Sequence, residues 1–373
     1  PIRIPMSRIS RKQLTELLRT SSSSSTPFTL LHAPPQWPYP SNASTSKVHI
    51  SILDSSFNPP TTAHLALICA PFPPITDISN PSSTIPKSPD RDYTTRLLLL
   101  SLKNVDKTPS STDATPQQRI EMMILLSKEV EKKTGQSCAV GICHEATFVG
   151  KNKVIREYLS SISTRYRNGG MGEKIDLTFL IGTDTLTRFF SPRYYPENQM
   201  ISLLMDFFKS TTLVSALRDS TVSEDVKKSV EITILKSEVV RPWTLSGKVR
   251  LLDLGEETEG VSSTSVRKQV KDKLRHKSVD GDERKTQRST KEDMVGTYML
   301  VDGDERREQV VVEDGREVDG DEGKEQVVVE DGREDGADER REQVVVQDGR
   351  EEDMIKGVLN TINEYIKIEG LYI

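Results

Sequence analysis

Two short segments of this chain, more than 200 residues apart, each combine the end of a strand with the start of a helix. The first runs from Ser55 to His64 and follows 48–53, an apolar, β-branched run typical of a buried parallel strand. Pro59 and Pro60 exclude helix before Thr61, so His64 falls in the first turn of the helix that follows. A single histidine there is most often a hydrogen-bonded core residue, and its interpretation depends on the second segment.

The second segment, Val261 to Arg267, has the same organisation after a strand pattern at 249–254. A run of hydroxyls opens its helix, which by itself most often means only a cap. The hydroxyl residues are Ser262, Ser263 and Thr264. Arg267 follows one turn later, where its guanidinium can reach an anion held at the helix N-terminus. Two helix starts that offer free N–H groups, hydroxyls and one cation predict a nucleotide-phosphate site.

Strand and helix patterns alternate along most of the chain. Apolar runs typical of strands lie near 48–53, 96–102, 138–143, 176–181, 212–217 and 249–253. Helical patterns lie at 61–70, 117–133, 151–165, 197–208 and 263–275. Such alternation predicts an α/β fold with a doubly wound parallel sheet, which binds ligands at the carboxyl ends of its strands. Both segments lie at such ends.

The two segments match, in order, a pair of motifs that occur together in one enzyme family. Ser56-Phe57-Asn58-Pro59 is similar to a G-S-F-N-P opening, and Thr61 to His64 takes the place of H-x-G-H. Val261 to Arg267 is similar to I-S-S-T-x-x-R. Over about 47–275 and 354–372 the chain resembles the nicotinamide/nicotinate mononucleotide adenylyltransferases, within the HxGH-type nucleotidyltransferase superfamily. The resemblance implies a Rossmann-like nucleotidyltransferase fold, and the threonine at position 61 favours the eukaryotic branch.

The resemblance implies transfer of AMP from ATP to nicotinamide or nicotinate mononucleotide, with release of pyrophosphate. Such an in-line reaction brings two polyanions together, so the protein must mainly position and neutralise them. In this interpretation His64 and Arg267 are the catalytic residues, at the α-phosphate and the departing pyrophosphate. The residues implied in ATP binding are Ser56, Phe57, Thr61, Gly182, Asp184, Arg218, Ser262, Ser263 and Thr264. Mg²⁺ is the expected cofactor, carried mainly by ATP phosphates and not by a protein metal site.

Some positions depart from the family pattern. His144 stands where the family has a tryptophan that stacks on the nicotinamide ring, and Tyr195 falls at an aromatic position; both are expected to bind the acceptor. Asp184 has two interpretations, an N-cap for a helix at 185–190 and a contact with the ATP ribose. Ser55 replaces the family's first glycine, so a positive φ would be strained there.

Two other functions remain open at this stage. The histidine at position 144 is compatible with another adenylyl- or cytidylyltransferase of the superfamily that uses a different phosphorylated acceptor. The other alternative is a non-catalytic nucleotide-binding scaffold, with acidic repeats near the C-terminus as the candidate element for binding a protein partner. The joint presence of His64 and Arg267 argues against the scaffold, because binding alone does not require both.

Composition divides the chain into four parts. The composition of residues 1–46 predicts a basic N-terminal helix followed by a Ser/Pro-rich linker. The helix is either a segment that docks on the core or a targeting sequence. Residues 47–275 are the expected core, completed by a C-terminal helix at 354–373. Between them, 276–353 is a low-complexity acidic insert with three 17-residue repeats, for which we expect disorder or a weak β-ribbon. The repeats at 301–351 carry 20 acidic and 8 basic residues, so the rest of the chain has net charge +7 and suits polyanionic nucleotides.

Cysteine usage and hydropathy limit the remaining possibilities. Cys69, Cys138 and Cys143 are too few and too unevenly spaced for a disulfide framework or a zinc site. No apolar run reaches membrane-spanning length. We therefore expect no membrane partner and a location in the cytoplasm and/or nucleus, and we expect no nucleic-acid partner. The partners that the resemblance implies are ATP and a pyridine mononucleotide.

Overall fold

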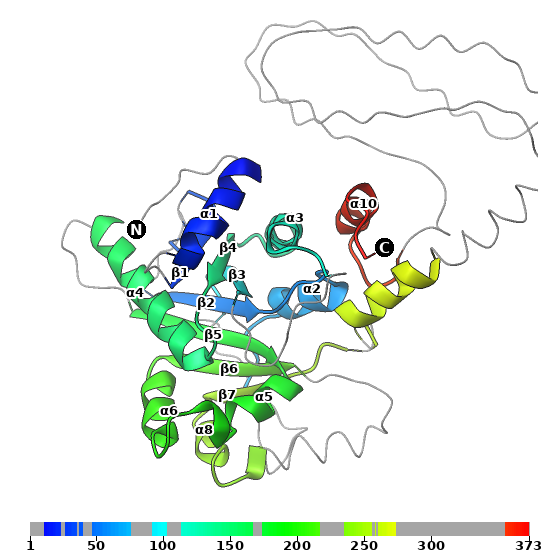
Figure 1. The fold of residues 1–373 in the computed structure, drawn as a ribbon. Coiled ribbons are helices and arrows are strands. Elements are labelled where there is room, and N and C mark those ends of the chain that lie inside the picture. The colour runs from blue at the N-terminus through cyan, green and yellow to red at the C-terminus, as the bar shows by residue number, and fades with distance from the viewer. Residues whose placement is uncertain are drawn as a thin grey trace, which may run out of the picture. The chain divides into compact units, whose positions relative to one another are not determined.

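A computed structural model of the chain describes residues 11–23, 27–35, 37–39, 47–75, 92–102, 113–166, 174–216, 235–255, 258, 260–273 and 355–372. These residues belong to one compact unit, 1–280 together with 352–373 (Figure 1). The repeats fall in a separate unit, 281–351, so the expected disorder of the insert lies outside the described residues.

Within the described residues, seven strands form one sheet in the order β1-β4-β3-β2-β5-β6-β7. The strands are β1 (Phe28–His32), β2 (Lys47–Asp54), β3 (Thr95–Ser101), β4 (Cys138–Cys143), β5 (Lys174–Gly182), β6 (Thr211–Ala216) and β7 (Val249–Leu252). Strands β2 to β7 are parallel, and β1 runs antiparallel to β4. The strand order reverses at β2, which lies between β3 and β5. This is the doubly wound sheet that the alternating pattern predicts.

Helices cover both faces of the sheet (Figure 1). One face carries α1 (Arg11–Ser23), α2 (Thr62–Cys69), α3 (Pro116–Thr134), a helix at 263–273 and α10 (Asn360–Ile368). The other face carries α4 (Phe148–Tyr166), α5 (Thr183–Phe189), α6 (Met200–Phe208) and α8 (Arg241–Leu245). A 3₁₀ turn, η2 (Pro192–Tyr194), follows α5.

Local sequence accounts for the helix boundaries. Helix α3 begins after Thr115, whose side chain exchanges capping hydrogen bonds with Gln118, and proline occupies its first position. It ends at Gly135, which has a φ of 68° that glycine adopts without strain. The same reciprocal cap starts α2.

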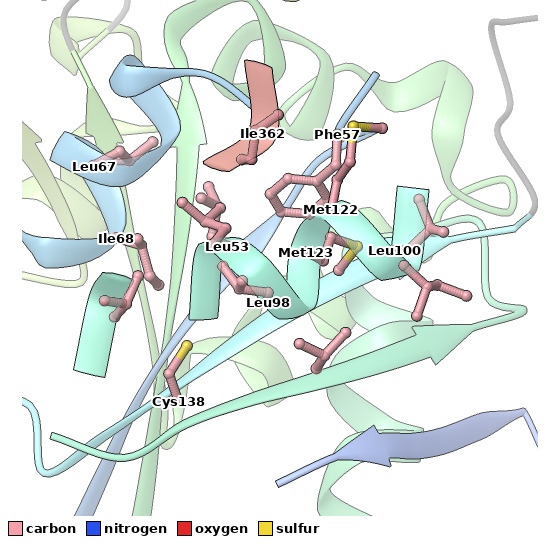
Figure 2. Close-up of a cluster of buried hydrophobic side chains, with 14 of the residues drawn as sticks. Leu53, Phe57, Leu67, Ile68, Leu98, Leu100, Met122, Met123, Cys138 and Ile362 are labelled. Carbon is pink, nitrogen blue, oxygen red and sulfur yellow. The ribbon is translucent and has the colours of Figure 1, made fainter. Parts of the chain in front are cut away.

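Two apolar clusters hold the layers together. Because alternate residues of a strand face opposite sides, Ile50 and Ile52 of β2 enter the cluster with α4, whereas Leu53 enters the other. Figure 2 shows this second cluster, which lies against α2, α3 and α10 and includes Leu53, Ile68, Leu98, Met122 and Ile362.

The N-terminal region contributes more to the core than the sequence predicts. The expected linker within 1–46 contains β1, which pairs with β4 at the sheet edge. Trp37 is buried nearby, and its indole N–H donates to the carbonyl oxygen of Arg96 at 3.0 Å. The linker prediction is therefore wrong for these residues, because a five-residue strand between Ser- and Pro-rich stretches is too short to show a clear period. Helix α1 packs Leu14 into the cluster that contains α3 and α10.

The C-terminal segment belongs to the same core, although it follows the repeats in sequence. Ile355, Val358, Ile362 and Ile366 are buried in the cluster with α2 and α3. Ile368, six residues after Ile362 and on another side of α10, is 76% exposed. Helix α10 therefore packs through one apolar face.

Truncation of Ile362 tests this packing. The side chain is 0% exposed, so Ile362→Ala removes buried apolar surface and leaves a cavity. We expect the free energy of unfolding to fall by about 2–5 kcal/mol. Ile368→Ala, on the exposed side of the same helix, is the matched control and should change it by less than about 0.5 kcal/mol. Denaturant titration measures both, and equal effects would show that α10 does not pack through this face.

Candidate functional site

The first motif forms the turn between β2 and α2. Thr61 is the N-cap of α2, and its hydroxyl accepts a hydrogen bond from the backbone N–H of His64. The His64 ring returns the interaction, because its Nδ1 accepts from the backbone N–H of Thr61 at 3.0 Å. This reciprocal cap holds the His64 ring at the helix start, near the positive end of the helix dipole.

The same contacts determine which nitrogen of His64 carries the proton. A backbone N–H only donates, so Nδ1 presents its lone pair to Thr61 and the proton of the neutral ring lies on Nε2. Nε2 lies 2.9 Å from Oγ of Ser55, directly after β2. The ring therefore directs an N–H donor toward the strand end, where it can stabilise an oxyanion.

The second motif starts the helix at 263–273 with its own reciprocal cap. The Ser262 hydroxyl accepts from the N–H of Ser265, and the Ser265 hydroxyl accepts from the N–H of Ser262, each at 3.0 Å. Ser263 instead donates to the carbonyl oxygen of Pro59 at 2.8 Å. Thr264 is exposed. Of the three hydroxyls expected at the ATP phosphates, that of Ser262 caps the helix and that of Ser263 binds the first motif. Thr264 is the most accessible of the three.

Arg267 joins the two motifs. Its Nη1 donates to the carbonyl oxygen of Asn58 at 2.5 Å, and its Nη2 lies 3.4 Å from the Thr264 hydroxyl. Its Nε lies 4.0 Å from a carboxylate oxygen of Asp113. Together with the Ser263 bond, these contacts place the two segments side by side, although Arg267 and Asn58 are 209 residues apart.

Asn58 is the centre of a polar network that the sequence does not reveal. Asn58 is 4% exposed, and its side-chain Nδ2 donates to the Asp113 carboxylate at 2.7 Å. Its Oδ1 accepts from the N–H of Ala114 at 3.1 Å and from the hydroxyl of Tyr372 at 3.0 Å. Burial raises the pKa of Tyr372, so this hydroxyl stays protonated and can donate. The network ties the first motif to the start of α3 and to the C-terminal end.

The other residues of the first motif are less accessible. Phe57 is buried, has a φ of 44° and packs its ring 5.3 Å from the His64 ring. Any ATP contact by Phe57 would therefore use its backbone. Ser55 lies outside the positive-φ region, so its replacement of glycine causes no strain. Ser56, between them, is partly buried.

The end of β5 lies at the same edge of the sheet. Gly182 is the N-cap of α5, so Asp184 lies inside the first turn of the helix with an exposed side chain. The N-cap interpretation of Asp184 is therefore wrong: Thr183 already starts the helix, and its hydroxyl anchors it to the carbonyl of Ala216 at 3.0 Å. The ribose contact stays a prediction. Arg218 lies outside the described residues.

The two expected acceptor residues lie on different sides of β2. His144 follows β4, and its backbone N–H donates to the carbonyl of Pro27 at 2.8 Å. Tyr195 follows η2, and its hydroxyl donates to the carbonyl of Phe189 at 2.6 Å. Burial raises the pKa of Tyr195, which keeps this donor protonated. Their role toward an acceptor stays a prediction.

A buried ion pair at this edge also escapes sequence reasoning. Asp54, the last residue of β2, pairs with Lys151 near the start of α4 and accepts from the Ser101 hydroxyl at 2.8 Å. The only hint of this pair in the local sequence is that the apolar strand ends in a charged residue, Asp54. Its partner is 97 residues away.

The described part of the chain contains neither a candidate metal cluster nor a candidate membrane-spanning helix. In these ranges no group of three or more His, Cys, Asp or Glu side chains could hold a metal ion. No helix among them is long and apolar enough to cross a membrane. The groups at the junction of the motifs are hydroxyls, N–H donors and a guanidinium, which suit phosphate oxygens.

Two joined helix starts lie at the carboxyl edge of a doubly wound sheet, which is the place where such α/β folds bind ligands and where helix starts suit phosphate. No protein-family model matches the chain. A Schizosaccharomyces pombe protein named "Putative nicotinamide mononucleotide adenylyltransferase" is 33% identical over 225 residues, which cover 59% of this chain and 75% of that protein. The chain therefore belongs to the nicotinamide mononucleotide adenylyltransferase family, a class of nucleotidyltransferases.

A solved structure shows a more distant likeness. It is the nicotinic acid mononucleotide adenylyltransferase of Plasmodium falciparum complexed with APC. The two chains share 13% identity with a TM-score of 0.32, over 59% of this chain and 83% of that one.

Substitution of Asn58 tests the network around the first motif. Asn58→Ala would remove the hydrogen bonds that the Asn58 side chain makes with the Asp113 carboxylate, the Ala114 N–H and the Tyr372 hydroxyl. We expect a loss of about 2–4 kcal/mol in the free energy of unfolding. Tyr372→Phe removes one of these bonds and should cost about 0.5–1.5 kcal/mol. Denaturant titration compares the two, and an Asn58→Ala effect no larger than that of Tyr372→Phe would contradict the central position of Asn58.

Proposed function

We propose that this protein transfers the adenylyl group of ATP to nicotinamide or nicotinate mononucleotide, forming a pyridine dinucleotide and pyrophosphate. The observation that carries the proposal is the junction of the motifs, in which Arg267 and Ser263 bind the carbonyl groups of Asn58 and Pro59. The name of the S. pombe relative supports a pyridine mononucleotide as the acceptor class.

In the proposed reaction, a phosphate oxygen of the acceptor mononucleotide attacks the α-phosphorus of ATP. The bond from the α-phosphorus to the bridging oxygen breaks in line with this attack, and pyrophosphate leaves. Arg267, Thr264 and the N–H groups at the start of the 263–273 helix neutralise the pyrophosphate. The Nε2–H of His64 donates to an α-phosphate oxygen as negative charge develops there. The reaction requires no protein nucleophile.

Magnesium enters this scheme with the substrate, as MgATP. The donor groups at the junction fit phosphate oxygens, whereas Mg²⁺ is usually held by carboxylates, phosphates and water. The ion would supply positive charge that screens the leaving pyrophosphate. We expect Gly182 and Asp184 to contact the ATP ribose, and His144 and Tyr195 to contact the acceptor ring.

His144 also supports a second candidate acceptor. It stands where the family has a stacking tryptophan, and its smaller, polar ring suits a phosphorylated acceptor without a pyridine. In that case the adenylyl chemistry at His64 and Arg267 is the same, and only the product differs.

One experiment separates these functions. The full chain is incubated with ATP, Mg²⁺ and a panel of mononucleotides, pyrophosphate release is followed, and the dinucleotide is identified by mass spectrometry. Nicotinamide or nicotinate mononucleotide should give the corresponding pyridine dinucleotide. Pyrophosphate release with another acceptor alone would reject the pyridine assignment, and ATP binding without transfer to any acceptor would indicate a scaffold.

Substitution of the two proposed catalytic residues tests the mechanism. His64→Ala and Arg267→Ala should each lower kcat by about 100-fold or more, because each removes a preorganised group that stabilises charge in the transition state. Lys268→Ala, at an exposed neighbouring position, is the matched control and should stay within about threefold. Melting temperatures are measured in parallel. A His64→Ala variant that loses thermal stability but keeps its turnover per folded molecule would make His64 a structural cap of α2.

A further inference from the structure

The ion pair of Asp54 and Lys151 lies beside the first motif. Asp54 directly precedes Ser55, whose hydroxyl contacts the His64 ring. The carboxylate of Asp54 pairs with the Lys151 ammonium group and accepts from the Ser101 hydroxyl at 2.8 Å. The side chains of Asp54 and Lys151 are 7% and 5% exposed. Burial of two charges costs free energy that an apolar pair of similar size would not, which points to a role beyond stability.

The pair lies on the face of the sheet opposite to the phosphate motifs. Asp54 shares the face of Ile50 and Ile52, which pack with α4, because residues two apart in a strand point the same way. Leu53 points to the other face, where α2 and the 263–273 helix lie. The strand order reverses at β2, and such a switch point is where doubly wound sheets bind ligands. A second substrate bound on the Asp54 side would reach the His64 region from the face opposite to ATP.

Within the described residues, the Lys151 ammonium group has more hydrogen-bond donors than acceptors. An ammonium group has three donors, and the acceptor for Lys151 within the described residues is Asp54. The Phe148 ring lies 4.7 Å from Nζ and stabilises the cation on one side. Both oxygens of Asp54, in contrast, are engaged, one by Lys151 and one by Ser101. A purely structural pair would satisfy the ammonium as fully as the carboxylate, because unmet donors on a buried charge are costly.

We infer that Lys151 binds the acceptor mononucleotide, an inference that rests on the proposed function. Its ammonium group donates to an oxyanion of that substrate, which is either the phosphate or, in the nicotinate form, the ring carboxylate. Asp54 and Ser101 are positioning residues that hold the ammonium in place. The two polyanions of the reaction are then held by separate cations, ATP by Arg267 and the acceptor mononucleotide by Lys151, on opposite faces of β2.

The double variant Asp54→Asn/Lys151→Met tests the inference, because it removes both charges and leaves neither one buried alone. Lys153→Met, at an exposed position of the same helix, is the matched control. Pyrophosphate release is measured with nicotinamide mononucleotide and nicotinate mononucleotide, each varied at saturating MgATP, and then with MgATP varied. In the double variant, KM for the mononucleotide should rise about tenfold or more, whereas KM for MgATP should stay within about threefold. Calorimetric Kd values for each mononucleotide without ATP should rise in parallel, and the control should match the wild type.

Each outcome has a distinct meaning. A similar rise for both mononucleotides supports binding of the phosphate, and a rise confined to the nicotinate form supports binding of the carboxylate. An unchanged KM for both in an active double variant overturns the inference. An equal rise in KM for MgATP and for the mononucleotide also overturns it. The same holds for a fall in rate that is explained by a smaller fraction of folded protein, because either result indicates a structural pair. A wild-type protein that turns over neither mononucleotide refutes the proposed function itself, and the inference falls with it.

Discussion

The hydrogen bonds from Arg267 and Ser263 to the carbonyl groups of Asn58 and Pro59 are the contacts on which the site depends. They connect a segment that follows β2, in the middle of the sheet, with one that follows β7, at its edge. A guanidinium bound to a carbonyl is a charge-assisted contact, stronger than a neutral hydrogen bond. It holds the two helix starts side by side, so that the His64 ring and the Arg267 charge both belong to the junction at the carboxyl edge of the sheet.

The C-terminal segment completes this arrangement. Gln269 hydrogen-bonds the backbone N–H and carbonyl of Lys356, and the N–H of Thr62 donates to the carbonyl of Gly357 at 2.9 Å. Gly357 has a φ of 81°, and a Cβ there would lie 2.8 Å from the side chain of Val261, so the close approach requires glycine. Because 269 and 356 are in contact, an insertion between them leaves the core connected at the same place, and long insertions add little closure entropy.

Strand β2 separates the two substrates in the proposed reaction. One face of its carboxyl end carries His64 and the joined motifs, and the other carries Asp54, Lys151 and the start of α4. Two polyanions repel each other, so their approach at one phosphorus is favoured when each has its own cation and its own side of the strand. The net charge of +7 outside the repeats favours both anions at longer range.

The sequence by itself determined the doubly wound parallel fold and the position of both motifs at strand ends, because strand period, helix period and capping residues are local signals. It did not determine the short strand β1, or the start of α5 one residue before Asp184, since neither has enough local pattern. The Asn58 network and the pairing of Asp54 with Lys151 were decided by the tertiary structure alone. Their partners are distant in sequence, and which polar side chains meet depends on the order of strands in the sheet, which no local pattern encodes.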